Sequence, residues 1–166
     1  EIIKSGVEIA VKAAKDKLVA LDIGPIGQLM KPYGTLSFDE AYEIFKEQVI
    51  IGAEAGADLI LIETMSDVYE VKAAILAAKE NCNLPVISTM TFEQDGRTLT
   101  GTEPLTMVNI VQGLGVNALG LNCSLGPEEI LPLIEEIIKY SKVPVIAQPN
   151  AGLPKVINGE TVFDIE

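Results

Sequence analysis

The sequence contains no histidine, two cysteines and half as many basic as acidic residues. Without histidine, the chain can form no Ser-His or Cys-His nucleophile pair and no imidazole metal site, and it lacks the commonest general base. Any chemistry must therefore come from carboxylates, hydroxyls, amides, thiols or an imported group. Two isolated cysteines and no secretory segment predict a reducing, cytoplasmic setting.

Positive charge is scarce as well, because 12 basic residues stand against 24 acidic ones and the net charge is −12. A phosphate backbone would be repelled, which predicts no nucleic-acid partner. Although 48% of the residues are hydrophobic, no unbroken apolar run is long enough for a membrane span, and none is predicted. The apolar residues occur instead in short runs, as in strands that are buried on both faces.

Five such runs, each bounded by Gly, Pro or Asn, predict five buried strands. They are Leu18–Ile23, Asp58–Glu63, Pro85–Thr91, Ala118–Cys123 and Pro144–Gln148. Amphipathic helical segments separate them, which predicts a parallel sheet with right-handed crossovers. No pattern marks a reversal of strand order, so we expect strands in sequence order, as in an incomplete (β/α)8 barrel. A flavodoxin-like sheet that binds a nucleotide fits the strand count, but the chain lacks a phosphate-binding loop.

The outer strands of such a sheet, Leu18–Ile23 and Pro144–Gln148, have unpaired edges. We expect a neighbouring chain to cover them, which predicts a homo-oligomer.

Several residues predict where helices begin. Ser37–Glu40 and Asp67–Glu70 both fit a capping box. Pro127 suits the first position of the last helix, while Pro132 predicts that the regular part of this helix begins late, near Ile130.

Polar residues gather at one end of the predicted strands. They are Asp22, Glu63, Thr64, Thr89, Thr91, Asn122, Cys123, Gln148 and Asn150. Because the carboxyl ends of parallel strands meet at one edge of a sheet, these residues predict one shared site.

Two of these residues have competing interpretations. Cys123, at a strand tip, is as well explained by metal-thiolate chemistry as by a buried free thiol. Glu63 follows the apolar run Leu59–Ile62, where a carboxylate needs a partner, and a ligand amine is favoured over a structural cation. The segment Asp95–Gly101 fits an exposed turn and a flap over the site equally well.

The ends of the chain also carry a prediction. The first helical segment has no N-cap, and the chain ends at Glu166, just after Gly159–Phe163, with no closing element. We therefore expect residues 1–166 to be a single fragment of a larger domain, truncated at both ends.

Five segments resemble, in order, the homocysteine-binding barrel of the homocysteine S-methyltransferases. They are Asp22–Gly27, Ala57–Thr64, Gly96–Gly101, Gly120–Pro127 and Pro149–Pro154, and the resemblance covers nearly the whole chain. Asn-Cys-Ser-Leu-Gly-Pro and Pro-Asn-Ala-Gly-Leu-Pro are closer to the cobalamin-dependent methionine synthase branch than to the betaine or S-methylmethionine branches.

The resemblance implies a (β/α)8 TIM barrel, of which this chain forms about strands three to seven. It implies a zinc held by three cysteines and by the homocysteine sulfur, which then attacks a methyl group on cobalamin to give methionine. Other domains supply the cobalamin and regenerate its methyl group from methyltetrahydrofolate. By the same resemblance, Cys123 is a zinc ligand, Glu63 and Asn150 bind substrate, and Asn122 is a further residue of the substrate site. No residue of the chain is assigned a catalytic role.

The sequence departs from the family pattern at both ends. The motif Gly-Gly-Cys-Cys-Gly-Thr, which supplies the other two zinc cysteines, is missing, as is the opening Asp-Gly motif. A barrel of this type takes about 250 residues, so we expect the chain alone to be inactive and to hold zinc weakly or not at all. An inert core with a purely structural role is the alternative.

Overall fold

The computed structural model describes residues 1–152 and 155–162. Its helices are α1 (Ile2–Ala14), α2 (Phe38–Glu54), α3 (Val68–Asn81), α4 (Pro104–Gly113) and α5 (Pro127–Tyr140). Its strands are β1 (Ala20–Ile23), β2 (Leu59–Met65), β3 (Val86–Met90), β4 (Ala118–Asn122), β5 (Val145–Gln148), β6 (Lys155–Ile157) and β7 (Glu160–Val162). All five predicted strands are present, with bounds that differ from the predicted ones by one or two residues at several ends.

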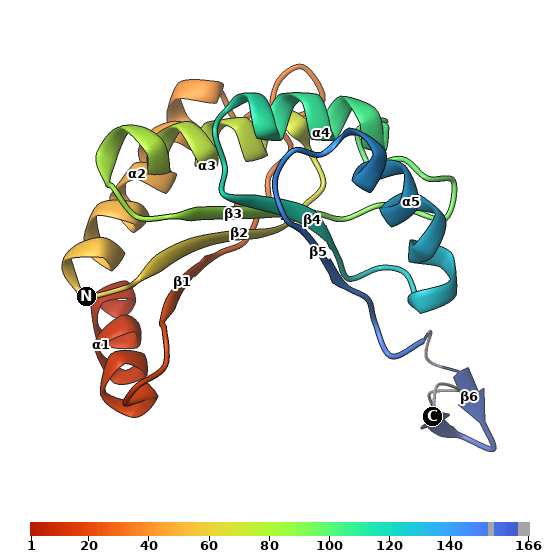
Figure 1. Ribbon diagram of the computed structural model, residues 1–166, viewed down its shortest axis with the longest axis horizontal. Coiled ribbons are helices and arrows are strands. Elements are labelled where there is room, and N and C mark those ends of the chain that lie inside the picture. The colour runs from red at the N-terminus through yellow and green to blue at the C-terminus, as the bar shows by residue number, and fades with distance from the viewer. Residues whose placement is uncertain (153–154, 163–166) are drawn as a thin grey trace.

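Strands β1 to β5 form one parallel sheet in the order β1-β2-β3-β4-β5. The sheet curves, and α2, α3 and α4 lie along the outer side of the curve (Figure 1). Within the residues that the structure describes, no helix covers the inner side. This arrangement confirms the incomplete barrel with strands in sequence order, and the flavodoxin-like alternative is wrong.

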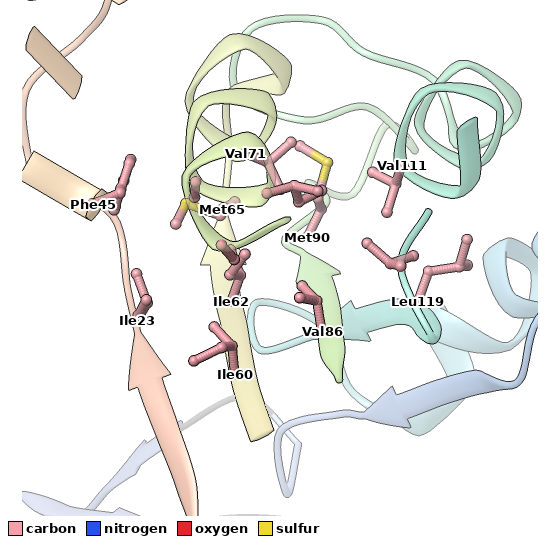
Figure 2. Close-up of a cluster of buried hydrophobic side chains, with 14 of the residues drawn as sticks. Ile23, Phe45, Ile60, Ile62, Met65, Val71, Val86, Met90, Val111 and Leu119 are labelled. Carbon is pink, nitrogen blue, oxygen red and sulfur yellow. The ribbon is translucent and has the colours of Figure 1, made fainter. Parts of the chain in front are cut away.

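Alternate residues of each strand face the helices, which gives the sheet two different faces. Ile60 and Ile62 of β2 are fully buried in the core between sheet and helices (Figure 2). Leu61, between them, points to the inner side, in register with Asp22 of β1 and Ile87 of β3. The inner face therefore carries the residues that a closed barrel would enclose.

The capping box predicted for α2 is confirmed. The Glu40 backbone N–H donates to Ser37 Oγ (3.3 Å), and the Ser37 backbone N–H donates to Glu40 Oε2 (2.9 Å).

The capping box predicted for α3 is wrong. Asp67 caps the helix by accepting from the Tyr69 backbone N–H (2.8 Å), but Glu70 does not return to the Asp67 backbone. The Glu70 carboxylate is buried and accepts instead from the backbone N–H of Ile26 (2.7 Å), in the loop after β1. Burial raises the pKa of Glu70, and the bond from Ile26 opposes this effect. Tertiary packing therefore uses Glu70 to brace a loop.

The predicted late start of the last helix is also wrong, because α5 begins at Pro127 and includes Pro132. Pro132 has no N–H to donate to the Glu128 carbonyl four residues earlier. Both residues are exposed, so water can satisfy that carbonyl and the helix continues.

A hairpin of β6 and β7 follows the sheet and was not predicted. Its turn residues Asn158 and Gly159 have φ values of 54° and 84°, and Asn-Gly is the pair that favours such a turn. The hairpin is a separate two-stranded sheet that does not pair with β5, so the expected truncation of the domain stays a prediction.

Strands β1 and β5 are the outer strands of the main sheet, as predicted. Whether another chain covers their edges stays a prediction. Across the described ranges, no helix is both long and apolar enough to cross a membrane.

Gly120 of β4 offers a test of this packing. A Cβ atom there would overlap the backbone carbonyl of Ile146 in β5. We expect Gly120→Ala to lower the free energy of unfolding by roughly 1–3 kcal/mol, measured by urea denaturation. Gly113→Ala is the control, because nothing lies within 4 Å of its added Cβ and a helical alanine is favoured by about 0.5–1 kcal/mol. Equal stability of the two variants would contradict the β4–β5 packing.

Candidate functional site

The side-chain amide of Asn122 lies at the centre of the predicted site, at the end of β4. Its Oδ1 accepts from the Thr64 backbone N–H (2.9 Å) and from Thr89 Oγ1 (2.7 Å). Its Nδ2 donates to Thr64 Oγ1 (2.7 Å) and to Cys123 Sγ (3.3 Å). The Asn122 backbone carbonyl accepts from Thr91 Oγ1 (3.1 Å). The ends of β2, β3 and β4 are thus joined by one residue.

The protein uses every hydrogen-bonding position of this amide, which has two donors and two acceptor lone pairs. Asn122 is only 3% exposed, so unpaired positions would be costly. The Thr64 backbone N–H also decides which way the amide points, because turning it over would bring two donors together. The amide is therefore held in one orientation.

The end of β2 contains a β-bulge. Ile62 pairs with Ser88 and Met65 with Met90, so β2 has one more residue than β3 over this stretch. Ile62 and Met65 are both fully buried, and the extra residue lets both face the core. Thr64 adopts a φ of 62°, which is rare for a β-branched residue. The bulge leaves Glu63 and Thr64 half-buried at the site.

The loop after β4 also departs from ordinary backbone geometry. Cys123 and Ser124 have φ values of 58° and 54°, in the left-handed region. The Cys123 N–H donates to the Gln148 carbonyl of β5 (3.0 Å), and the Leu125 N–H donates to the Cys123 carbonyl (2.7 Å). The Cys123 residue is exposed, so its thiol lies at the strand tip and is not part of the core.

Asn150 lies in the loop after β5, which packs on the loop after β4. Its backbone N–H donates to the Leu125 carbonyl (2.9 Å). The structure therefore places Asn150 and Cys123 on neighbouring loops, at the carboxyl ends of adjacent strands.

The carboxylate of Glu63 has an unfavourable environment. Burial raises its pKa, and the nearby negative charge of Asp22 raises it further. None of the ion pairs formed among residues 1–152 and 155–162 includes Glu63. A cationic group that reached this position would relieve both effects.

The segment Asp95–Gly101, predicted to be a turn or a flap, is an ordered loop at the same end of the sheet. The Glu93 N–H donates to the Arg97 carbonyl (2.8 Å), and Thr100 Oγ1 donates to the Ser66 carbonyl just after β2 (3.3 Å). Arg97 forms an ion pair with Glu103 at the start of α4. The Arg97 guanidinium therefore stabilises the loop and its connection to α4.

The structure thus joins Asn122 and Cys123 directly and links Glu63 to them through Thr64. Over the part of the chain that is described, no three His, Cys, Asp or Glu residues lie close enough to hold a metal ion. The tie between Asn122 and Thr64 was not predicted, and nothing in the local sequence marks a left-handed threonine. The proximity of Asp22 to Glu63 follows from the strand register and could have been found.

Comparison with known proteins gives consistent results. A family model described as Homocysteine S-methyltransferase matches residues 1–166. Methionine synthase from Mycobacterium tuberculosis is 31% identical over 145 residues, which cover 84% of this chain and 12% of that protein. The chain therefore spans about an eighth of the length of this relative.

Two solved structures have a similar fold. The apo form of the homocysteine methyltransferase MmuM from Escherichia coli matches with a TM-score of 0.76 at 24% identity, over 89% of this chain and 57% of that chain. The metallated form of MmuM matches with a TM-score of 0.73 at 24% identity, over 90% of this chain and 58% of that chain. These matches support the incomplete-barrel fold.

The raised pKa of Glu63 predicts how stability depends on pH. The folded chain keeps the Glu63 proton to a higher pH than the unfolded chain does, so ionisation opposes folding. This loss of folding stability is absent below the unfolded pKa of about 4.3. It grows as the pH rises towards the folded pKa of Glu63 and reaches its full size above that pKa. We expect Glu63→Gln to raise the melting temperature at pH 7 but not at pH 4.

The control for this measurement is Glu47→Gln, which removes the same charge from an exposed position on α2. Any stabilisation common to both variants reflects the net charge of −12 rather than the site. A Glu63→Gln variant with the same pH profile as Glu47→Gln would contradict the electrostatic account of Glu63.

Proposed function

Because the chain belongs to the homocysteine S-methyltransferase family, we propose that it forms part of a barrel that binds homocysteine and presents its sulfur for methylation, giving methionine. The proposal rests on one observation above all. The family resemblance assigns Glu63 to the amine of homocysteine and Cys123 to the zinc that holds its sulfur. Both residues lie at the carboxyl end of the sheet, where Asn122 bonds to Cys123 and to Thr64, the neighbour of Glu63.

The reaction requires little proton chemistry from the protein. The homocysteine thiol loses its proton to solvent water, a bond forms between sulfur and the methyl carbon, and the bond from methyl to donor breaks with its electron pair remaining on the donor. No histidine base is available in this chain. Its residues would act by binding and orienting the substrate.

Glu63 is proposed to bind the amine of homocysteine. Its carboxylate is half-buried, lies near Asp22 and forms none of the ion pairs found in the described residues. A substrate ammonium would supply the missing positive charge and favour the ionised carboxylate. Asn150, on the loop beside Cys123, is proposed as a further substrate contact.

Cys123 is proposed as a ligand of the zinc that the family resemblance implies. The described residues do not fit a complete zinc site, since a structural or catalytic zinc takes three or four protein ligands and no group of three candidate residues is present in the described ranges. The other ligands would have to be sulfur atoms from outside these residues. Among the described residues, the chain therefore supplies one proposed zinc ligand, Cys123.

The methyl donor is proposed to be methylcobalamin, carried with the folate chemistry by other domains of a longer, cytoplasmic protein. The methionine synthase name of the relative, and its much greater length, support this choice. A betaine or S-methylmethionine donor is the alternative within the family. The presence of a single thiol at this end of the sheet also favours a second candidate, in which this chain is an inert structural core.

The zinc proposal has a direct test in the chain as it stands. One exposed thiol should bind zinc weakly, because thiolate sites gain their affinity from several sulfurs acting together. We expect well below one zinc per chain by elemental analysis after dialysis, and the same content in Cys82→Ser. One tightly held zinc per chain, lost in Cys123→Ser, would contradict this expectation.

The roles of Glu63 and Cys123 can be separated in the full-length protein. Cys123→Ser should remove most of the zinc and nearly all methyl transfer, because a hydroxyl is a poor replacement for a soft thiolate. Glu63→Gln should keep the zinc and weaken homocysteine binding about ten- to a hundredfold, the loss of one charge-assisted hydrogen bond of roughly 1.5–3 kcal/mol.

Zinc analysis and calorimetric titration with homocysteine on both variants provide the measurement. Normal homocysteine binding by Glu63→Gln would contradict the amine-binding role, and loss of zinc from that variant would contradict the separation of roles. Absence of homocysteine binding by the unmutated full-length protein would favour the structural alternative.

A further inference from the structure

Glu63 lies within the bulge at the end of β2, directly before Thr64. Between Ile62 and Met65, which both point into the core, the chain must accommodate two residues where an ordinary strand has one. Glu63 and Thr64 are those residues, and the left-handed φ of Thr64 closes the bulge. If Thr64 relaxed to ordinary strand geometry, Thr64 would turn towards the helices and Met65 towards the inner side, and the backbone next to Glu63 would no longer be held in its present place.

The contacts that hold this conformation come from β4, two strands away in the sheet order. Asn122 forms two hydrogen bonds with Thr64, accepting one from its backbone N–H and donating one to its hydroxyl. The bond from Thr89 of β3 keeps the amide in place between the two strands. A non-glycine residue in the left-handed region needs such support.

The same amide contacts the other half of the site. Its second Nδ2 hydrogen is directed to Cys123 Sγ, on a residue whose own φ is left-handed. One rigid, 3% exposed group therefore touches both the residue next to Glu63 and the thiol of Cys123.

We propose that Asn122 is a positioning residue that fixes Glu63 and Cys123 relative to each other, so that the amine and the sulfur of one homocysteine molecule are bound together. This inference rests on the proposed function. It differs from a substrate-contact role for Asn122, because all four hydrogen-bonding positions of the amide are occupied by protein atoms.

The test uses Asn122→Ala in the full-length protein with zinc bound. We expect homocysteine affinity, measured by calorimetry, to fall about ten- to a hundredfold, as for loss of the Glu63 contact itself. We also expect faster amide hydrogen exchange in peptides that cover the end of β2, because the Thr64 N–H loses its acceptor. The exchange readout does not depend on methyl transfer.

The matched control is Asn117→Ala. Asn117 directly precedes β4, and its Oδ1 accepts from the backbone N–H of Val86 (2.9 Å), the first residue of β3. This bond lies at the amino ends of β3 and β4, whereas Asn122 lies at their carboxyl ends. Its removal tests loss of a strand-bracing asparagine far from the site. We expect Asn117→Ala to bind homocysteine within about twofold of the unmutated protein, with unchanged exchange at the end of β2.

A second substitution distinguishes positioning from general destabilisation. Glycine adopts a positive φ without strain, so adding Thr64→Gly to Asn122→Ala should restore the bulge and recover about fivefold of the lost affinity. Thr64→Val removes only the hydroxyl bond to Asn122 and should weaken homocysteine binding about three- to tenfold. This single variant keeps the inference testable even if Asn122→Ala does not fold.

Three results would overturn the positioning role: Asn122→Ala binding homocysteine as tightly as Asn117→Ala, no recovery with Thr64→Gly, or normal binding by Thr64→Val. Each requires that the unmutated protein binds homocysteine. Failure of the unmutated protein to bind would instead overturn the proposed function, and the two failures are thereby distinguished.

Discussion

Each strand of the curved sheet must bury one face beneath the helices, and this constraint decides what lies at the site. Ile60 and Ile62 occupy the buried face of β2, so the residues that alternate with them face the inner side of the curve. A strand that kept strict alternation would send Thr64 towards the helices and Met65 inward. The bulge allows Met65 to remain in the core, while the Glu63 carboxylate lies at the carboxyl end of the sheet.

This arrangement has an energetic cost that the structure offsets locally. A non-glycine residue in the left-handed region costs roughly 1–2 kcal/mol, and Thr64, Cys123 and Ser124 are all in that region. Thr64 receives two bonds from Asn122, each worth about 0.5–1.5 kcal/mol net. The strain and its compensation at Thr64 are therefore of similar size. A site of this kind is stable only while the amide that supports it is fully bonded.

Much of the fold follows from local sequence, whereas the connections across strands do not. The five strands and the cap at Ser37 have short-range signals, namely apolar runs between breakers and a serine three residues before a glutamate. Glu70 and Pro132 departed from prediction because tertiary contact and exposure, rather than local pattern, decide their roles. Asn122 was placed at the site by its position at a strand end, and the resemblance made it a residue of the substrate site. Its bonds to Thr64 join positions 58 residues apart, which one sequence does not reveal.

The electrostatics at the carboxyl end of the sheet favour a ligand with an ammonium group over a simple thiol. Glu63 and Asp22 repel each other, and burial makes the repulsion at Glu63 more costly. In a chain with a net charge of −12, an anionic thiolate without an amine would meet only further repulsion there. A ligand that carries an ammonium group several bonds from its sulfur would neutralise Glu63 while its sulfur approached Cys123. Selectivity for an amino-acid thiol would then arise from the same carboxylate that weakens the free fold, a common compromise at binding sites.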